Sequence, residues 1–370
     1  MPFDSLKECR CPLLTVVSNQ ESDRMTRSET PSEVPHGAAS GESLDAHHPQ
    51  GLRLSAPSIV IEWENAGHCR GDRSARMLGA LFQQLAELQT SFCGSAEVVV
   101  LCDAAKVDIA ALQSLIEKTA VSAGCTTNTR IVESKRCPYY QQKNYGFSLT
   151  SRPTVIFLDS DVVPENLWLM RLLETLQRQR VAAVCGNTYI EPDSVYARSF
   201  AMFWFFPLRS KDGPSFDSAW FFANNVAFRR EVFLAHPFPN ADAFRGQCTL
   251  LARTLLATGH RILMEPKARV SHPPPNGIAH FVSRSLCEGR DECRLSHLYG
   301  EPGIRRALQR FKQDIRRSVA EILRRRTSLN VGLLGTVTAI MLAGLYYTLK
   351  LFGYLLSLVN HRIIDRWFPI

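Results

Sequence analysis

The sequence predicts an α/β protein, because short apolar segments alternate with segments whose apolar residues recur every three or four positions. The most informative segment is residues 155–163. Its apolar first half has the composition of a strand that is buried on both faces of a sheet. Its second half carries Asp159 and Asp161, which therefore fall at the carboxyl edge of the sheet, where open α/β folds bind ligands.

These two carboxylates point to a metal ion. Closely spaced acidic groups are costly to bury without a cation, and no obvious Arg or Lys stands near Asp159 or Asp161 in the sequence. A divalent metal is the natural partner. The alternative is that Asp159 caps the following helix while Asp161 faces solvent, since Asp-x-Asp is a common tripeptide.

The order of the elements favours a parallel sheet with right-handed crossovers. The predicted strands are residues 58–63, 97–102, 129–132 and 155–158, and the predicted helices are residues 77–88, 109–119 and 166–178. No glycine-rich dinucleotide loop or P-loop follows any of these strands, so side chains and a metal would have to hold a nucleotide. Asp103, at the end of the second strand, is placed to accept hydrogen bonds from a base or ribose, and a capping or turn role is the alternative.

Composition bounds the class of protein. The 370 residues carry a formal net charge of +8, and Arg and Lys crowd residues 305–326, which favours an anionic membrane surface and no nucleic acid partner. The 11 cysteines show no paired spacing, and no secretory signal or Asn-x-Ser/Thr sequon is present, so we expect reduced thiols and a cytosolic catalytic part. Residues 1–54 are rich in polar residues and are expected to form a disordered N-terminal tail.

Several motifs in order resemble family 2 glycosyltransferases of the GT-A fold, over roughly residues 55–272. No one of these motifs is specific alone, but their order and spacing match the family. They are the strands at residues 58–61 and 98–103, Lys143-Asn144-Tyr145-Gly146, the strand ending in Asp159-Ser160-Asp161, residues 224–231, Thr258-Gly259, residues 266–270 and His272.

The resemblance implies a Rossmann-like mixed sheet flanked by helices and a nucleotide-diphosphate sugar donor. It implies Mn²⁺ or Mg²⁺ held by Asp161, with help from Asp159 and His272. A hard cation of this kind prefers oxygen ligands and bridges phosphates, and one imidazole shifts the preference towards Mn²⁺. The donor-contacting residues implied by the resemblance are Glu62, Asp103, Asn144 and Asp159.

The sequence departs from the family at the catalytic base. The family places Glu-Asp before the helix that leads to Thr258-Gly259, whereas this chain has Gln247-Cys248 there. An amide cannot accept the proton, and a thiolate needs an activating group that the sequence does not identify. The nearest carboxylate is Asp242, which we name as the substitute base.

Residues 200–206 and 220–222 are unusually aromatic. Core packing behind the sheet is the simpler interpretation, because aromatic side chains dominate protein cores. An acceptor-side surface that faces lipid or sugar rings is the alternative.

The C-terminal part predicts a membrane module. Apolar residues recur every three or four positions from residue 304 to 322 with Arg and Lys between them, as in a basic amphipathic helix that lies in an anionic leaflet. A soluble helix packed on the catalytic domain is the alternative. Residues 329–349 form an uncharged, mostly apolar run that is long enough to cross a bilayer.

Lys350 interrupts this run, and residues 351–359 continue it. One long tilted helix with Lys350 snorkelling is the first interpretation, and a span followed by an interfacial segment or a tight hairpin are the alternatives. Three arginines precede the run, and by the positive-inside rule they keep the N-terminal domain in the cytosol. They are Arg324, Arg325 and Arg326.

Together these features predict a membrane-anchored, metal-dependent glycosyltransferase that acts on a lipid-linked or glycan acceptor in polysaccharide biosynthesis, by resemblance with inversion. The alternatives are a catalytically impaired membrane scaffold and a sugar nucleotidyltransferase. The predicted parts are a tail (residues 1–54), a GT-A domain (55–285), a basic juxtamembrane region (286–327), a transmembrane segment (328–360) and a short tail (361–370).

Overall fold

A computed structural model of the chain describes residues 53–69, 71–134, 137–241, 243, 245–296, 302–360 and 362–368. These residues lie in one compact unit that begins at Gly51. The predicted tail therefore lies outside the described residues except for Arg53 and Leu54, and Leu54 is buried in a strand, β1.

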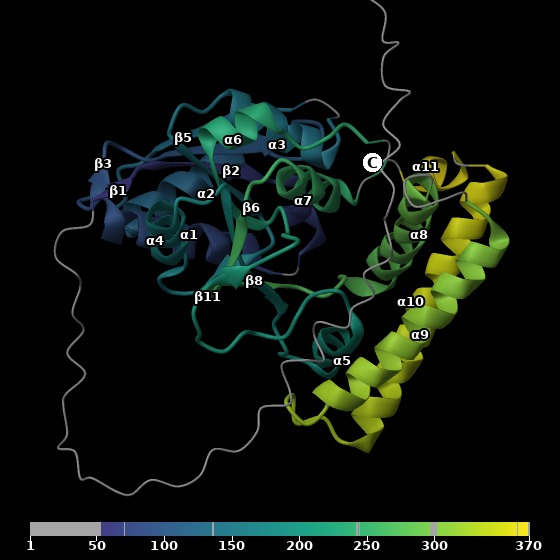
Figure 1. The fold of residues 1–370 in the computed structure, drawn as a ribbon. Helices are drawn as coiled ribbons and strands as arrows, with labels where there is room; N and C mark the ends of the chain where they lie inside the picture. The colour runs from purple at the N-terminus through teal and green to yellow at the C-terminus, as the bar shows by residue number, and fades with distance from the viewer. Residues whose placement is uncertain are drawn as a thin grey trace, which may run out of the picture. The chain divides into compact units, whose positions relative to one another are not determined.

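The core of this unit is a mixed β-sheet (Figure 1). In the described residues it has nine strands, with the order β5-β4-β2-β6-β10-β8-β11-β7 and β9 paired to β11. Their bounds are β5 (Asn128–Glu133), β4 (Glu97–Cys102), β2 (Pro57–Glu62), β6 (Thr154–Asp159), β10 (Asn225–Arg229), β8 (Ala183–Ile190), β11 (Ile262–His272), β7 (Val163–Pro164) and β9 (Phe216–Asp217).

The first four of these strands in the sheet are parallel, as the sequence predicts. The sheet becomes mixed at β10, which is antiparallel to both β6 and β8. β11 then runs parallel to β8. The predicted α/β fold with a Rossmann-like mixed sheet flanked by helices is confirmed.

Helices cover both faces of this sheet. Alternate residues of the central strands pack on α1 (Arg73–Leu88), α2 (Ile109–Ser122) and α4 (Trp168–Gln179), and the intervening residues pack on α3 (Tyr139–Ser148), α6 (Arg230–Ala235) and α7 (Gln247–Ala257). In β2, for example, Ile59 and Ile61 face the first group and Val60 the second. This double coverage explains why the strands have no alternation of polar and apolar residues.

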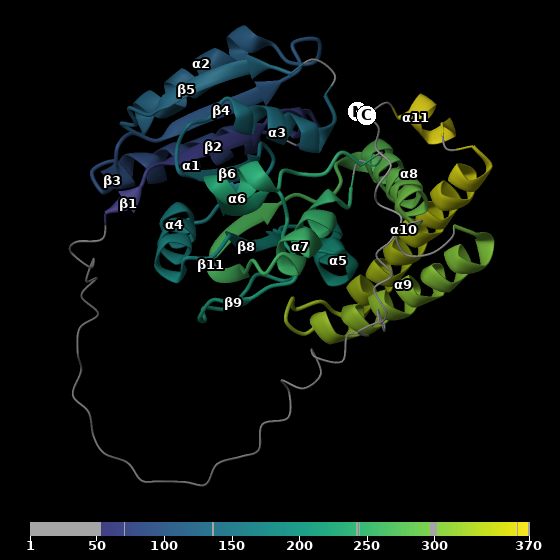
Figure 2. The same ribbon diagram turned by 45° about the horizontal axis from the view of Figure 1, so that its top comes forward.

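Smaller elements border the sheet at its edges. β1 (Leu54–Ser55) pairs with β3 (Phe92–Cys93), and a 3-10 helix (Glu64–His68) follows β2. The described residues contain further helices towards the C-terminal part of the unit. They are α5 (Val195–Phe203), α8 (Gly277–Leu295), α9 (Ile304–Arg325), α10 (Leu333–Val359) and α11 (Ile363–Trp367). Figure 2 shows α8, α9, α10 and α11 together on one side of the sheet.

One helix, α10, is long and apolar enough to span a membrane. It packs on α8, α9 and α5. The prediction that Lys350 snorkels is wrong. Its side chain on α10 is only 15% exposed, and it forms ion pairs with Glu292 and Asp314 at 2.8 and 2.9 Å. The predicted boundary between the catalytic domain and the juxtamembrane region, at residues 285/286, falls inside α8. The helix α8 therefore runs across this boundary without a break.

The predicted basic helix, α9, is present, but its apolar face is partly covered. Ala307 and Ile322 are buried, and Arg325 donates hydrogen bonds to the backbone carbonyls of Ala201 and Phe206. The apolar face of α9 therefore packs on the domain, as in the alternative interpretation. The basic face of α9 remains exposed to solvent.

Candidate functional site

The acidic residues of the site meet where β2 and β6 end. These strands pair in parallel register, so that Glu62 lies opposite Asp159. Both carboxylates are buried, as is Asp161 two residues further on. Burial and the charge of Asp159 together raise the pKa of Glu62 well above its usual value. Glu62 is occupied locally, since it accepts hydrogen bonds from the backbone and side-chain amides of Asn65 at 3.0 and 2.7 Å.

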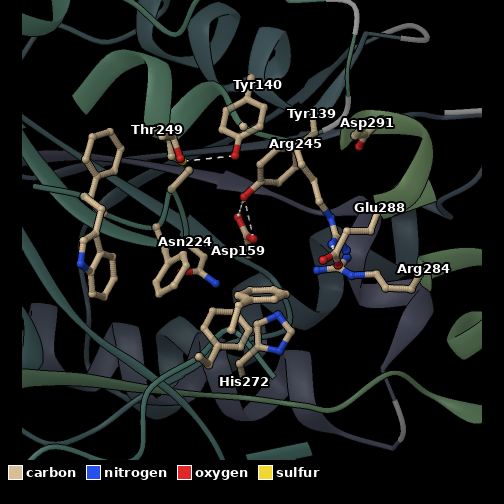
Figure 3. A pocket seen from close by; sticks show the side chains of 18 of the residues that line it. Tyr139, Tyr140, Asp159, Asn224, Arg245, Thr249, His272, Arg284, Glu288 and Asp291 are labelled. Atoms are coloured by element: carbon tan, nitrogen blue, oxygen red, sulfur yellow. Dashed lines mark hydrogen bonds and ion pairs between the residues drawn. The ribbon is translucent and has the colours of Figure 1, made fainter. Parts of the chain in front are cut away.

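Asp159 has a buried cation as its partner, which the sequence analysis did not foresee. Nζ of Lys143, a fully buried side chain on α3, lies 2.6 Å from Oδ1 of Asp159. The hydroxyl of Tyr139 donates to the same carboxylate at 2.8 Å, as Figure 3 shows. Lys143 neutralises Asp159, so only Asp161 of the pair retains an unpaired charge at the cavity.

Asp161 faces His272. Oδ1 of Asp161 is buried and has no hydrogen-bond partner among the described residues. Its Oδ2 lies 3.5 Å from Nε2 of His272. Burial raises the pKa of Asp161, although Arg73 and Arg284 act in the opposite direction. Arg73 also fixes the backbone here, because its Nε donates to the carbonyl of Asp161 at 2.6 Å.

The tautomer of His272 makes this contact informative. Nδ1 lies 2.5 Å from the carbonyl oxygen of Pro273 and must donate to it, which leaves Nε2 as an acceptor. Burial and nearby Arg284 lower the pKa of His272 to about 3, so the ring is neutral. When Asp161 is ionised, two acceptors, Nε2 of His272 and Oδ2 of Asp161, therefore face each other, and a cation between them would satisfy both.

This arrangement fits a divalent cation with few protein ligands. Among the described residues, no group of three His, Cys, Asp or Glu side chains has the geometry to hold a metal ion. Asp161 and His272 would supply one oxygen and one nitrogen, and phosphate oxygens and water would complete the shell, as is usual for Mg²⁺ and Mn²⁺ at phosphate sites.

A cavity of about 510 Å³ opens at Asp161. A second, of about 360 Å³, lies beside Glu62 and His68. Two arginines, Arg245 and Arg284, line both cavities. Figure 3 shows these arginines beside Glu288 at one end of the first cavity, with His272 and Asp159 further in.

The two arginines carry more positive charge than their carboxylate neighbour compensates. Nη1 of Arg245 pairs with Glu288 at 2.5 Å. Nε of Arg284 is buried without a hydrogen-bond partner among the described residues, and its guanidinium stacks on Trp204 at 5.4 Å. Burial and the charge of Arg245 lower the pKa of Arg284 to about 10. An anion between the cavities would relieve this repulsion.

Two predicted donor-contacting residues have local partners. Asp103 accepts from the backbone amide of Ala105 at 3.0 Å, which is the turn role named as its alternative. Asn144 binds the backbone of Phe238 twice, donating to its carbonyl at 2.8 Å and accepting from its amide at 3.1 Å. Donor contacts by Asp103 and Asn144 stay predictions.

The position of the family's base holds no basic group. The amide nitrogen of Gln247 donates to the carbonyl of Ala243. Cys248 contacts the hydroxyl of Tyr140 at 3.2 Å, and burial raises the pKa of its thiol to about 12, so it is not a thiolate. Asp242, the predicted substitute, lies outside the described residues.

The aromatic segments divide between the core and the wall of the first cavity, and an acceptor-side role stays a prediction. Phe200 and Trp204 are buried against α10, and Nε1 of Trp204 donates to the hydroxyl of Tyr346 at 3.0 Å, so this part is core. Phe205 and Trp220 are 44% and 41% exposed and line the first cavity. They form an aromatic wall of this cavity, and the guanidinium of Arg245 lies over the Phe205 ring at 5.7 Å from its centroid.

The sequence analysis missed Lys143, Arg284 and Glu288. Lys143 stands in the recognised Lys-Asn-x-Gly element, so a lysine in that motif was the available signal. Arg284 and Glu288 lie on α8, four residues apart and hence on one face of a helix, but no pattern in the sequence tells that this face points to the cavity.

The comparisons with known proteins agree with this geometry. Residues 130–235, which contain Lys143 and the two aspartates, match the family model described as Glycosyl transferase family 2. This match confirms, over those residues, the resemblance drawn from the motifs. A search of curated proteins found no significant match.

Two solved structures are similar to the chain. The mannosyltransferase PcManGT from Pyrobaculum calidifontis, in complex with GDP-Man and Mn²⁺, is 16% identical with a TM-score of 0.49, over 82% of this chain and 87% of that one. GalNAc-T7 with UDP, GalNAc and Mn²⁺ is 15% identical with a TM-score of 0.43, over 60% of this chain and 44% of that one.

Proposed function

We propose that the protein transfers a sugar from a nucleotide-diphosphate sugar to a lipid-linked or glycan acceptor, with inversion and with Mn²⁺ or Mg²⁺. The observation that carries the proposal is the pair of facing acceptors, Oδ2 of Asp161 and Nε2 of His272, which line a 510 Å³ cavity. When bound, the metal would neutralise charge that develops on the departing diphosphate.

The arginines would hold the donor's diphosphate. Arg284 and Arg245 lie between the cavity at Asp161 and the cavity at Glu62, so a nucleotide in the second would direct its phosphates past them to the first. A guanidinium matches a phosphate in a fork geometry, and here the pairing would also relieve the repulsion between two cations.

The aromatic wall would receive the acceptor. Phe205 and Trp220 line the cavity, and aromatic ring faces stack on sugar rings or cover a lipid chain. Asp242 is proposed as the base that takes the acceptor's proton, since Gln247 and Cys248 cannot do so.

The chain is proposed to act at a membrane with its catalytic domain in the cytosol. α10 has the length and composition of a membrane-binding helix, and exposed basic residues of α9 precede it in the sequence. Cytosolic nucleotide sugars and a membrane-bound acceptor then meet at one site, as polysaccharide biosynthesis requires.

A scaffold without turnover is the second candidate, and the observation that favours it is the replacement of the family's base by Gln247 and Cys248. Donor hydrolysis distinguishes the two. The purified protein would be incubated with a panel of nucleotide sugars and Mn²⁺, next to the double variant Asp159→Ala/Asp161→Ala, with nucleotide binding measured in parallel.

Metal-dependent release of one nucleotide, lost in the double variant, is the expected result. Nucleotide binding without release, even when candidate acceptors are added, would favour the scaffold. Absence of nucleotide binding would overturn the proposal.

A further inference from the structure

α10 exposes a continuous apolar stripe on one side. Leu334 and Met341 are 82% and 69% exposed, although both are large and apolar. The positions of the stripe are three, four or seven residues apart and so fall on one face of the helix. They are Leu334, Val337, Met341, Leu345, Phe352 and Val359. Exposed apolar patches of this length mark interaction sites.

The opposite face of α10 is held by charge. Lys350 comes sixteen residues after Leu334, which at 3.6 residues per turn places it about 160° around the helix. Its Nζ lies 2.8 Å from Glu292 and 3.5 Å from Glu288 on α8, and 2.9 Å from Asp314 on α9. One face of α10 therefore packs on the protein, whereas the apolar stripe on the other face is not covered by the described residues.

This asymmetry is incompatible with a helix that crosses the bilayer alone. α10 packs on α8 and α9, so a crossing would bring charged side chains of those helices, including the carboxylates that pair with Lys350, to the depth of the acyl chains or would break the ion pairs. Either result is costly. A helix that lies in the plane of the leaflet buries the stripe and leaves Lys350 where it is.

The neighbouring helix supplies charge that fits an anionic leaflet. α9 and α10 run side by side, as Figures 1 and 2 show. Basic side chains are exposed along the outer face of α9. They include Arg305, Arg310, Lys312, Arg316, Arg317 and Arg324.

We infer that α10 binds an anionic membrane in the plane of one leaflet, with its apolar stripe among the acyl chains and the basic face of α9 at the headgroups. This inference rests on the proposed membrane association and specifies its geometry. Lys350, on the face of α10 away from the stripe, also lines the 510 Å³ cavity, so the width of one helix separates the leaflet from the cavity and a lipid-linked acceptor could reach it without leaving the membrane.

Vesicle co-sedimentation tests the surface. The full chain would be mixed with neutral phosphatidylcholine vesicles and with vesicles that contain phosphatidylglycerol. The bound fraction on anionic vesicles is expected to exceed that on neutral ones and to fall at least about tenfold in Met341→Glu/Leu345→Glu. The control is Val121→Glu, at an apolar position on α2 that is 80% exposed, which should bind like the unmodified chain.

A topology measurement tests the orientation. A C-terminal epitope tag on the full chain in sealed vesicles should be digested by added protease from the side that bears the catalytic domain. A protected tag would show that α10 crosses the membrane and would overturn the inference while leaving membrane association intact.

The remaining outcomes are also decisive. Absence of vesicle binding would overturn both the inference and the membrane association, whereas donor hydrolysis in detergent tests the transferase separately. Binding that Met341→Glu/Leu345→Glu leaves unchanged would exclude the stripe. Dimerisation without lipid that this variant abolishes, with no vesicle binding, would assign the stripe to a second copy of the chain.

Discussion

At the scale of single residues, the contact between Asp161 and His272 decides what the cavity can hold. Asp161→Asn keeps the side-chain shape and removes the charge. We expect Mn²⁺ affinity to fall by at least about tenfold, since even changes behind a metal ligand cost 10–100-fold. Titration with Mn²⁺ followed by the electron paramagnetic resonance signal of the free ion measures this without turnover.

The control for this change is Asp103→Asn, because the carboxylate of Asp103 accepts from the backbone of Ala105 and does not meet His272. It should bind Mn²⁺ as the unmodified protein does. Equal Mn²⁺ affinities for Asp161→Asn and the unmodified protein would exclude Asp161 as a ligand.

Arg284 should discriminate between diphosphate and monophosphate. In Arg284→Gln, the dissociation constant for the nucleoside diphosphate should rise by roughly 10–100-fold, as expected for loss of a charge-assisted pair of about 1.5–3 kcal/mol, and that for the monophosphate should change less. Calorimetric titration of both ligands gives the ratio. The control is Lys118→Gln, which removes an exposed cation on α2 and should leave the ratio of the two dissociation constants unchanged. If Arg284→Gln weakens the binding of both ligands equally, Arg284 does not contact the outer phosphate.

The base is tested by Asp242→Asn. If Asp242 takes the acceptor's proton, the rate of sugar transfer should fall by about 10²–10⁴-fold while the donor still binds. Single-turnover assays with a saturating donor measure this step. Glu117→Gln, on the exposed side of α2, is the control, and transfer at the normal rate by Asp242→Asn would remove Asp242 from the mechanism.

The place of a single residue in the site was predictable where that residue belongs to a local sequence motif. Asp159, Asp161 and His272 follow strands, and strand ends meet at one edge of a sheet, so their proximity could be expected. The Lys143–Asp159 ion pair could not be expected, because it depends on how α3 packs on the sheet, and packing of a helix on a distant strand leaves no local pattern.

At the scale of elements, the crossing of α8 and α10 depends on two glycines. A Cβ on Gly289 would collide with the carbonyl oxygen of Lys350, and one on Gly353 with that of Leu286. Gly289→Ala should therefore separate the helices and destabilise the protein by about 1–3 kcal/mol, as overpacking does. The fall in melting temperature measures it.

α10 provides the matched control. Gly344 has no atom within 4 Å of its would-be Cβ, so Gly344→Ala should be neutral or should stabilise the helix by about 0.5–1 kcal/mol. Equal melting temperatures for the two variants would mean that the close crossing is not maintained in solution.

The strands and helices of the N-terminal half were predictable within a few residues. The strand at residues 97–102 coincides with β4, and the helix predicted at 166–178 is α4, two residues later at its start. The antiparallel insertion of β10 was not predictable from periodicity, because a buried strand looks alike in either direction. For α10, composition gave length and apolarity but could not show that Lys350 faces carboxylates of other helices.

At the scale of the whole molecule, one charged network joins the cavity to the C-terminal helices. Glu288 pairs with Arg245 at the cavity and with Lys350 on α10. Arg245 and Lys350 are 43 and 62 positions from Glu288 in the sequence, so no local pattern could reveal that the three side chains meet. A displacement of α10 would remove Lys350 from Glu288, the partner of Arg245, and would in this way link the proposed membrane surface to the proposed diphosphate site.

This network should make stability depend on pH in acid. Burial alone would raise the pKa of Glu288, but Lys350 and Arg245 lower it to about 2, below the usual 4.5. A lowered folded-state pKa contributes stability that is complete above pH 4.5 and is lost as the pH falls towards 2. The melting temperature should therefore fall more steeply below pH 4.5 for the unmodified protein than for Glu288→Gln, whose neutral amide cannot titrate. Thermal scans at steps of pH measure the two slopes, and parallel curves would mean that Glu288 is not held ionised by Lys350 and Arg245 in solution.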